Sequence, residues 1–110
     1  MALHNELGIQ KGYSILHRNW RSGKKELYIV AIYDNTLVVI EVKTRRDVLY
    51  GNPEDAVNGQ KIRKIVSSTD AYIRRYAIDL PVRFDIITMT GTDIPFQIEH
   101  IEEAFYPPIW

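Results

Sequence analysis

The sequence predicts an α/β domain in which one helix packs on a layer of strands, and three patterns predict it. Two β-branched apolar runs, Leu27–Tyr33 and Leu37–Val42, are separated by an Asp-Asn pair, as in an antiparallel hairpin with a tight turn. Past the middle of the chain, apolar residues recur at steps of three and four, which is typical of an amphipathic helix. Val82–Thr90 alternates and then becomes continuously apolar, as in a buried strand.

Composition limits the class of protein. A chain of 110 residues is expected to fold as one domain that spans residues 1–110. It contains no cysteine, which excludes disulfides, thiolate metal sites and cysteine nucleophiles and suits a reducing compartment. No apolar run is long enough to cross a bilayer, and no charged-then-apolar leader is visible. We therefore expect a cytoplasmic protein without a membrane partner.

Charge is unevenly distributed along the chain, although the formal net charge is zero. Residues 11–46 contain eight basic and three acidic side chains, whereas residues 79–110 contain one basic and six acidic side chains. The basic half could bind phosphate and the acidic half would repel it. Both stretches also fit ordinary solvated surfaces, so charge alone does not assign a function.

The first predicted strand is Gly12–Trp20, and a turn at Ser22-Gly23 leads into the hairpin. His17 on this strand is expected to be a packed or surface histidine, because no second histidine lies at a metal-binding spacing. After the hairpin, Asn52 and Pro53 are typical of the start of a short helix.

An Asn-Gly pair at positions 58 and 59 interrupts this short helix, and the main helix is predicted from Gln60 to about Arg75 or Tyr76. Arg83 and Asp85 share one face of the next strand, where a structural ion pair is the favoured interpretation. A turn at 91–95, a short strand over Phe96–Ile101 and a helical turn over Glu102–Phe105 are expected to complete the chain.

The hairpin brings four polar residues together. If Tyr33 and Thr36 bracket the turn, facing residue numbers sum to 69, so Tyr28 lies opposite Glu41 and Glu26 opposite Lys43. Facing Cβ atoms are roughly 4.5–5.5 Å apart. The sequence therefore predicts one small patch that contains all four side chains.

The tripeptide Glu41-Val42-Lys43 places a carboxylate and an ammonium on one face of a strand end. Metal-assisted cleavage of phosphodiesters uses such a pair: the carboxylate holds a divalent cation, and the lysine stabilises the attacking water or the developing charge. The same tripeptide also occurs as a simple surface charge pair. One acid is a small ligand set for Mg²⁺, Tyr28 is a poor ligand, and Glu26 is expected to pair with Lys43.

Several segments resemble the YraN-like family of uncharacterised bacterial proteins, over nearly the whole chain. These segments are His4–Gly8, Gly12–Leu16, Arg18–Arg21, Glu41–Arg45, Gly51–Val57, Arg83–Asp85 and Ile98–Phe105. That family is similar to the PD-(D/E)XK nuclease superfamily, which includes Holliday-junction resolvases and has a mixed sheet with a helix on each face. The resemblance implies a restriction-endonuclease-like core, nucleic-acid binding and Mg²⁺-dependent cleavage, with Glu41 and Lys43 matching the (D/E)XK element.

The sequence departs from this pattern at two places. Relatives carry an aspartate, the expected metal ligand, at the strand position where this chain has Tyr28. Relatives also carry a helix of several turns between the elements that end at Gly8 and begin at Gly12, whereas three residues separate them here. The loss of most of that first helix would uncover one face of the sheet, which a second copy could cover as a homodimer.

We therefore expect a nuclease-like protein that binds DNA or another nucleic acid but has weak or no activity. Glu41, Lys43, Glu26 and Tyr28 form the expected site, with Mg²⁺ weakly bound at Glu41 or absent. Arg45, Arg46 and Lys61 are the expected phosphate contacts. Two alternatives stay open: a homodimeric interaction module without nucleic-acid binding, and an active Mg²⁺-dependent nuclease in which Glu26 and Glu41 hold the metal.

Overall fold

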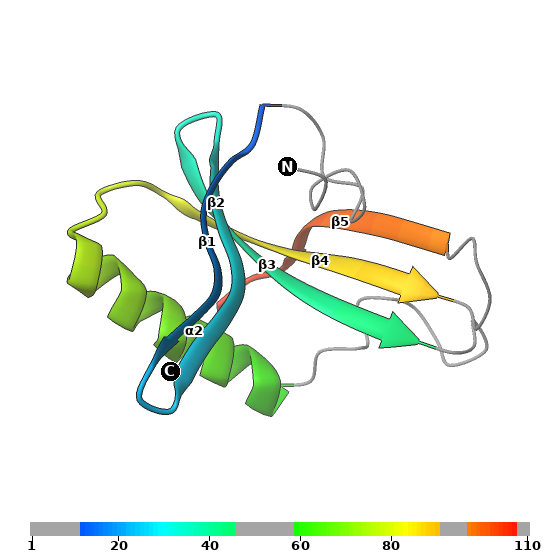
Figure 1. Ribbon diagram of the computed structural model, residues 1–110, viewed down its shortest axis with the longest axis horizontal. Coiled ribbons are helices and arrows are strands. Elements are labelled where there is room, and N and C mark those ends of the chain that lie inside the picture. The colour runs from blue at the N-terminus through cyan, green and yellow to red at the C-terminus, as the bar shows by residue number, and fades with distance from the viewer. Residues whose placement is uncertain (1–11, 46–58, 91–96, 108–110) are drawn as a thin grey trace.

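The computed structural model describes residues 12–45, 59–90 and 97–107. They form five strands and one helix (Figure 1). The elements are β1 (Ser14–Ser22), β2 (Lys25–Tyr33), β3 (Thr36–Arg45), α2 (Gly59–Tyr76), β4 (Val82–Thr90) and β5 (Gln97–Phe105). The predicted segments at 1–11, the short helix after Asn52 and the turn at 91–95 lie outside the described residues.

The strands form one sheet in the order β1-β2-β3-β4-β5. The β3–β4 pair is parallel, and the other neighbouring pairs are antiparallel. A parallel pair needs a crossover connection, and α2 lies in the chain between β3 and β4. Figure 1 shows α2 crossing one face of the sheet beside β1 and β2. The predicted α/β fold is confirmed, and it is consistent with a nuclease-like core.

The β2–β3 hairpin has the predicted register over its turn half. The paired residues run from Tyr33 opposite Thr36 to Ile29 opposite Ile40, and the two residue numbers of each pair sum to 69. Asp34 and Asn35 have φ angles of 50° and 55°. Two consecutive positive φ values are typical of the type I′ turn, whose twist matches that of the flanking strands.

The helix α2 begins within one residue of the predicted start and ends at Tyr76. Its buried stripe includes Ile65 and Tyr72, which pack on Leu27 and Val30 of β2. After Tyr76 the chain ends the helix without a glycine: Ala77 has a φ of 52°, and the Ile78 amide donates to the Ile73 carbonyl oxygen at 3.0 Å. Such a bond satisfies a carbonyl at the helix end.

The C-terminal segment differs from its prediction. Residues Glu102–Phe105 continue β5 as a strand and do not form a helical turn. Phe105 pairs with Phe84 and stacks on its ring, with 5.1 Å between centroids, so pairing with β4 extends the strand. The register shifts between Phe84 and Ile86, and Glu103 in this region has a φ of 49°. The irregularity is therefore a β-bulge within an edge strand, and not the predicted helical turn.

Both faces of the sheet are buried in the described residues. The face beneath α2 contains Trp20, Leu37 and Phe84 together with the helix side chains. On the other face, Ile29, Ala31, Val38, Ile40 and Ile87 have no solvent exposure. The uncovered apolar face expected from the short N-terminal region is therefore not seen among these side chains. No helix within the described part of the chain is long and apolar enough to cross a membrane.

Candidate functional site

A cleft opens where β2 leaves β3. The β2–β3 pairing stops at Ile29 and Ile40, although both strands continue. Beyond that point β2 stays paired with β1, for example through Leu27 opposite Trp20. The ends of β1 and β2 and the first half of α2 form the walls of a cavity of about 790 Å³. We call this cavity the hairpin–helix cleft.

The backbone is irregular beside the cleft. Leu27 and Val30 both join the core beneath α2, although strict alternation would send residues three apart to opposite faces. On the neighbouring strand, Asn19 has a φ of 53° and lines the cleft. Asparagine adopts positive φ more readily than most residues. As a result, the consecutive residues Leu27 and Tyr28 both line the cleft, one buried and one exposed.

The charges that line the cleft are mainly positive. Of the described residues that line it, two are acidic, Glu26 and Glu41. Six are basic, and they come from both walls: Arg21, Lys24 and Lys25 from the β1–β2 hairpin, and Lys61, Arg63 and Lys64 from α2. Closely spaced cations around a concave surface raise the local concentration of anions. The cleft is therefore an electropositive surface in a chain without net charge.

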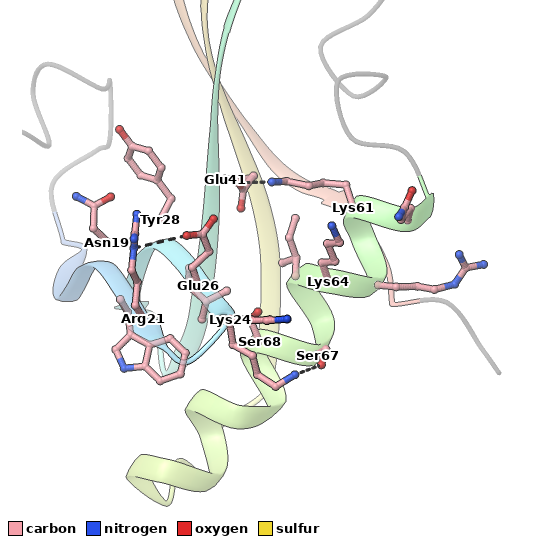
Figure 2. Close-up of a pocket in the computed structure, with 16 residues that line it drawn as sticks. Asn19, Arg21, Lys24, Glu26, Tyr28, Glu41, Lys61, Lys64, Ser67 and Ser68 are labelled. Carbon is pink, nitrogen blue, oxygen red and sulfur yellow. Dashed lines mark hydrogen bonds and ion pairs between the residues drawn. The ribbon is translucent and has the colours of Figure 1, made fainter.

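Glu41 is the buried acid of the cleft. Its side chain is 12% exposed, and its carboxylate lies 3.6 Å from Nζ of Lys61 (Figure 2). Burial raises the pKa of Glu41, because a charged carboxylate loses hydration there, and the positive charge of Lys61 partly opposes this rise. Lys43 also lowers this pKa, and the negative charge of Glu26 raises it.

Glu26 pairs with a different partner from the one predicted. Its carboxylate lies 3.6 Å from Nε of Arg21, which is opposite Glu26 in the β1–β2 register. The predicted pair with Lys43 was wrong, because the β2–β3 ladder ends before these positions while β1 remains paired with β2. Figure 2 shows Glu26 and Arg21 on the hairpin wall.

Tyr28 is exposed on the hairpin wall, with 42% of its surface accessible. Across the cleft, Nζ of Lys25 donates to Oγ of Ser67 at 2.7 Å, which joins the hairpin to α2. The predicted patch is therefore partly assembled: three of its four residues, Glu26, Tyr28 and Glu41, line one cleft. Lys61, a predicted phosphate contact, lines the same cleft. Lys43 is half-buried and is not among the described residues that line it.

A second group of charges lies on the opposite face of the sheet. Arg83 donates to both carboxylate oxygens of Asp85, at 2.9 and 2.8 Å, which confirms the predicted pair. Nε2 of His100 lies 2.7 Å from Oδ2 of Asp85, and the Glu103 amide donates to Oδ1 at 3.1 Å. Arg83 also donates to the hydroxyl of Tyr13. We call these residues the Asp85 network.

Both carboxylate oxygens of Asp85 accept hydrogen bonds from within the Asp85 network. Burial alone would raise the pKa of Asp85, but hydrogen bonds from His100, Arg83 and the Glu103 amide outweigh it and hold the pKa below its usual value. Sequence reasoning found Arg83 and Asp85 from their shared strand face. It missed His100 and Tyr13, because their approach depends on the register of β5 and on the position of β1, and no local pattern encodes either.

His17 is packed, as predicted. Its Nδ1 lies 2.7 Å from the hydroxyl oxygen of Tyr72, and its ring lies 5.1 Å from that of Tyr76. Trp20 meets Tyr72 edge to face at 5.1 Å and donates to the Tyr76 hydroxyl at 3.2 Å. Burial raises the pKa of Tyr72 to about 12. This aromatic group fastens β1 to the second half of α2.

Comparison with known proteins assigns the family. A model described as "Uncharacterised protein family UPF0102" matches residues 5–89. The chain belongs to this family. UPF0102 is the YraN family that the sequence resembles, and the PD-(D/E)XK-like superfamily is consistent with it.

Curated UPF0102 proteins match the chain over its length. The UPF0102 protein of Phocaeicola vulgatus is 64% identical, with both chains covered in full. That of Bacteroides thetaiotaomicron is 50% identical, also with full coverage. That of Flavobacterium psychrophilum is 42% identical over 96% of this chain and 98% of the relative.

The lengths of the UPF0102 alignments agree with a missing segment. The first two extend over 121 positions, and this chain has 110 residues, so at least 11 positions have no residue here. Eleven residues equal about three turns of helix. That is the scale of the helix expected to be missing between Gly8 and Gly12.

The donor set of the cleft does not fit a Mg²⁺ ion of the kind that the nuclease superfamily uses. Mg²⁺ favours octahedral coordination by oxygen and is usually held by one or two carboxylates. Here the Glu41 carboxylate faces an ammonium, and the Glu26 carboxylate faces a guanidinium. Across the described ranges, no three side chains of His, Asp or Glu gather closely enough to hold a metal ion.

The remaining predicted phosphate contacts fall at the end of β3. Arg45 is the last residue of the strand, but its side chain lies outside the described residues, as does all of Arg46. The cations of the cleft that sequence reasoning missed are Arg21, Lys24, Lys25, Arg63 and Lys64. Their common location depends on how the hairpin docks on α2.

Proposed function

We propose that this chain binds nucleic acid along the hairpin–helix cleft and does not cleave it. The observation that carries the proposal is the charge of the cleft: six basic and two acidic residues line it. Phosphate contacts by lysine and arginine supply most of the sequence-independent affinity of proteins for nucleic acid. A concave surface with cations on both walls suits a polyanionic chain that lies between them.

The environment of the two acids supports binding without cleavage. In the nuclease superfamily, two acids hold the metal, but here Tyr28 stands at the strand position of the second acid. Lys61 lies beside Glu41, where its positive charge offsets the negative charge of the carboxylate. The same ammonium group can contact a phosphate at the cleft. Glu26 lies 3.6 Å from Arg21 in an exposed pair that water screens, so the cleavage assay tests whether it can replace the missing ligand. Binding is therefore expected to be independent of divalent metal.

The first experiment measures binding and its salt dependence. The wild type and an Arg63→Ala/Lys64→Ala variant are titrated into labelled oligonucleotides at several salt concentrations, with EDTA present. The variant should bind more weakly, and the slope of log affinity against log salt should fall in magnitude by about 1.5, since two phosphate contacts are lost. Absence of wild-type binding at low salt would contradict the proposal.

The matched control is Arg74→Ala/Arg75→Ala. It removes the same charge from the last turn of the same helix, outside the cleft. Binding by this control should stay close to that of the wild type. An equal loss in both double variants would mean that net charge, and not the cleft, determines binding.

Cleavage is tested separately with Mg²⁺ or Mn²⁺ on branched, duplex and single-stranded DNA. We expect no cleavage by the wild type. Robust cleavage that is lost in Glu41→Ala would overturn the inactive assignment. Cleavage gained by Tyr28→Asp would show that the missing acid is what limits the wild type.

A further inference from the structure

We infer that the cleft takes single-stranded nucleic acid, with one unpaired base stacked on the ring of Tyr28 and the flanking phosphates against the basic residues of α2. The inference rests on the proposed function. It adds that the nucleic acid is single-stranded and that Tyr28 is the residue that contacts an unpaired base. Three features carry it: the exposed ring of Tyr28, the cations that line the same cleft, and the size of the cavity.

Tyr28 differs from the tyrosines that pack within the domain. Tyr13 stacks on Tyr33, with 4.2 Å between centroids, and Tyr72 and Tyr76 pack around His17 and Trp20. Among the residues that the structure describes, Tyr28 stacks on no other ring, and it is 42% exposed inside a cavity. A large aromatic surface that the core does not use is thus available to a ligand.

The charges around Tyr28 suit a nucleotide chain. Figure 2 shows Tyr28 on the hairpin wall, with Lys61 and Lys64 on the opposite wall and Glu41 between. Since the ring points away from α2 in Figure 2, a strand with one base on Tyr28 would cross the cleft to bring its neighbouring phosphates to the ammonium groups of α2. Asn19 lines the same wall and has an amide that can both donate and accept hydrogen bonds at a base edge.

The stacking surface selects for unpaired bases. In a duplex each base is stacked between its neighbours, and the grooves present base edges and not faces. Proteins that bind single strands combine a cationic groove with aromatic side chains on which the bases stack. The cavity, at about 790 Å³, is within the usual 300–1,000 Å³ range of ligand pockets, so it can enclose a base with part of its backbone.

The test compares single-stranded and duplex oligonucleotides of the same sequence, with wild type, Tyr28→Ala and Tyr28→Phe. We expect the wild type to favour the single strand. Tyr28→Ala should weaken single-strand binding by roughly 5- to 150-fold and leave duplex binding within a factor of two. Tyr28→Phe keeps the ring and should retain the affinity. Because no phosphate contact is removed, the salt slope of Tyr28→Ala should match that of the wild type.

A second readout reports stacking directly. An oligonucleotide that contains 2-aminopurine should lose fluorescence on binding to wild type and to Tyr28→Phe, and much less when bound to Tyr28→Ala at saturation. Tyr28 is exposed, so its replacement should leave the thermal midpoint nearly unchanged, which a melting curve checks.

The outcomes separate the two proposals. Equal wild-type affinity for single strand and duplex, or a loss of less than twofold in Tyr28→Ala, would overturn the stacking inference. If Arg63→Ala/Lys64→Ala still weakens binding in that case, the cleft remains the nucleic-acid surface. If the wild type binds neither ligand at low salt, both proposals fail.

Discussion

Asp85 and Glu41 lie at consecutive positions along the β3–β4 pair, but their carboxylates differ in how many hydrogen-bond donors and charges surround them. Asp85 pairs with Ile40 across the parallel strands, and Glu41 pairs with Ile86 one position further on. Since side chains alternate, Asp85 lies on the face away from α2 and Glu41 on the face toward it. Asp85 accepts hydrogen bonds from two side chains and one backbone amide, whereas Glu41 has one ammonium at 3.6 Å.

This difference distinguishes the Asp85 network, whose charges pair with one another, from the hairpin–helix cleft, where we propose that a ligand binds. In the Asp85 network the buried acceptor is saturated, and little of it could bind anything else without a loss of stability. In the cleft, cations outnumber acids and Glu41 is only partly compensated. The contrast supports a structural role for one face and the proposed binding role for the other, and the variants below test the structural side of it.

The largest effect is expected from Asp85→Asn. It removes the fully buried carboxylate partner of Arg83 and leaves only the exposed Glu102 among its described acidic partners, and breaking a buried pair in this way costs about 3–5 kcal/mol. Urea unfolding measures the change. The folded pKa of Asp85 is lowered, so its contribution to stability is present above the unfolded pKa near 3.8 and is lost as pH falls through the folded pKa. A loss below 1 kcal/mol would contradict the structural assignment.

A smaller effect of opposite sign is expected from Glu41→Gln. The folded pKa of Glu41 is raised, so wild-type stability should fall as pH rises from the unfolded pKa near 4.5 through the folded pKa. The glutamine variant has no carboxyl to ionise and should lack this fall. Thermal melts from pH 4 to 8 should therefore nearly coincide at the acidic end and favour the variant at neutral pH. Curves that favour the wild type at neutral pH would show that Lys61 outweighs burial.

The smallest effect is expected from Glu102→Gln. Glu102 lies 3.5 Å from Nη1 of Arg83, but its side chain is 52% exposed, so water screens the pair. Unfolding free energy should change by about 0–1 kcal/mol. Because Asp85 and Glu102 share Arg83, this variant is the internal control for Asp85→Asn. Equal losses in both would remove the distinction between the buried and the exposed partner.

Local patterns predicted the elements well, and the tertiary arrangement of the cleft less well. The turn chemistry of Asp34 and Asn35 determined the hairpin register, and the apolar spacing determined α2 to within one residue. The β2–β3 pairing ends at Ile29 and Ile40, so Glu26 and Lys43 do not face each other. Where the pairing ends is a tertiary property that the local sequence pattern does not encode. Residues Glu102–Phe105 were assigned to a helical turn because strand pairing with β4 is a long-range contact.

The cleft can form only after the chain between the parallel strands β3 and β4 has folded back onto the sheet. Strands β1 to β3 follow one another through short turns, whereas β4 can join β3 only after the chain that contains α2 has folded back. The cleft needs both parts, because Tyr28 lies on the hairpin and Lys61 on the helix. A ligand in the cleft therefore recognises only the completed domain. By mass action it would stabilise that domain by about 2.7 kcal/mol at a concentration 100 times its Kd.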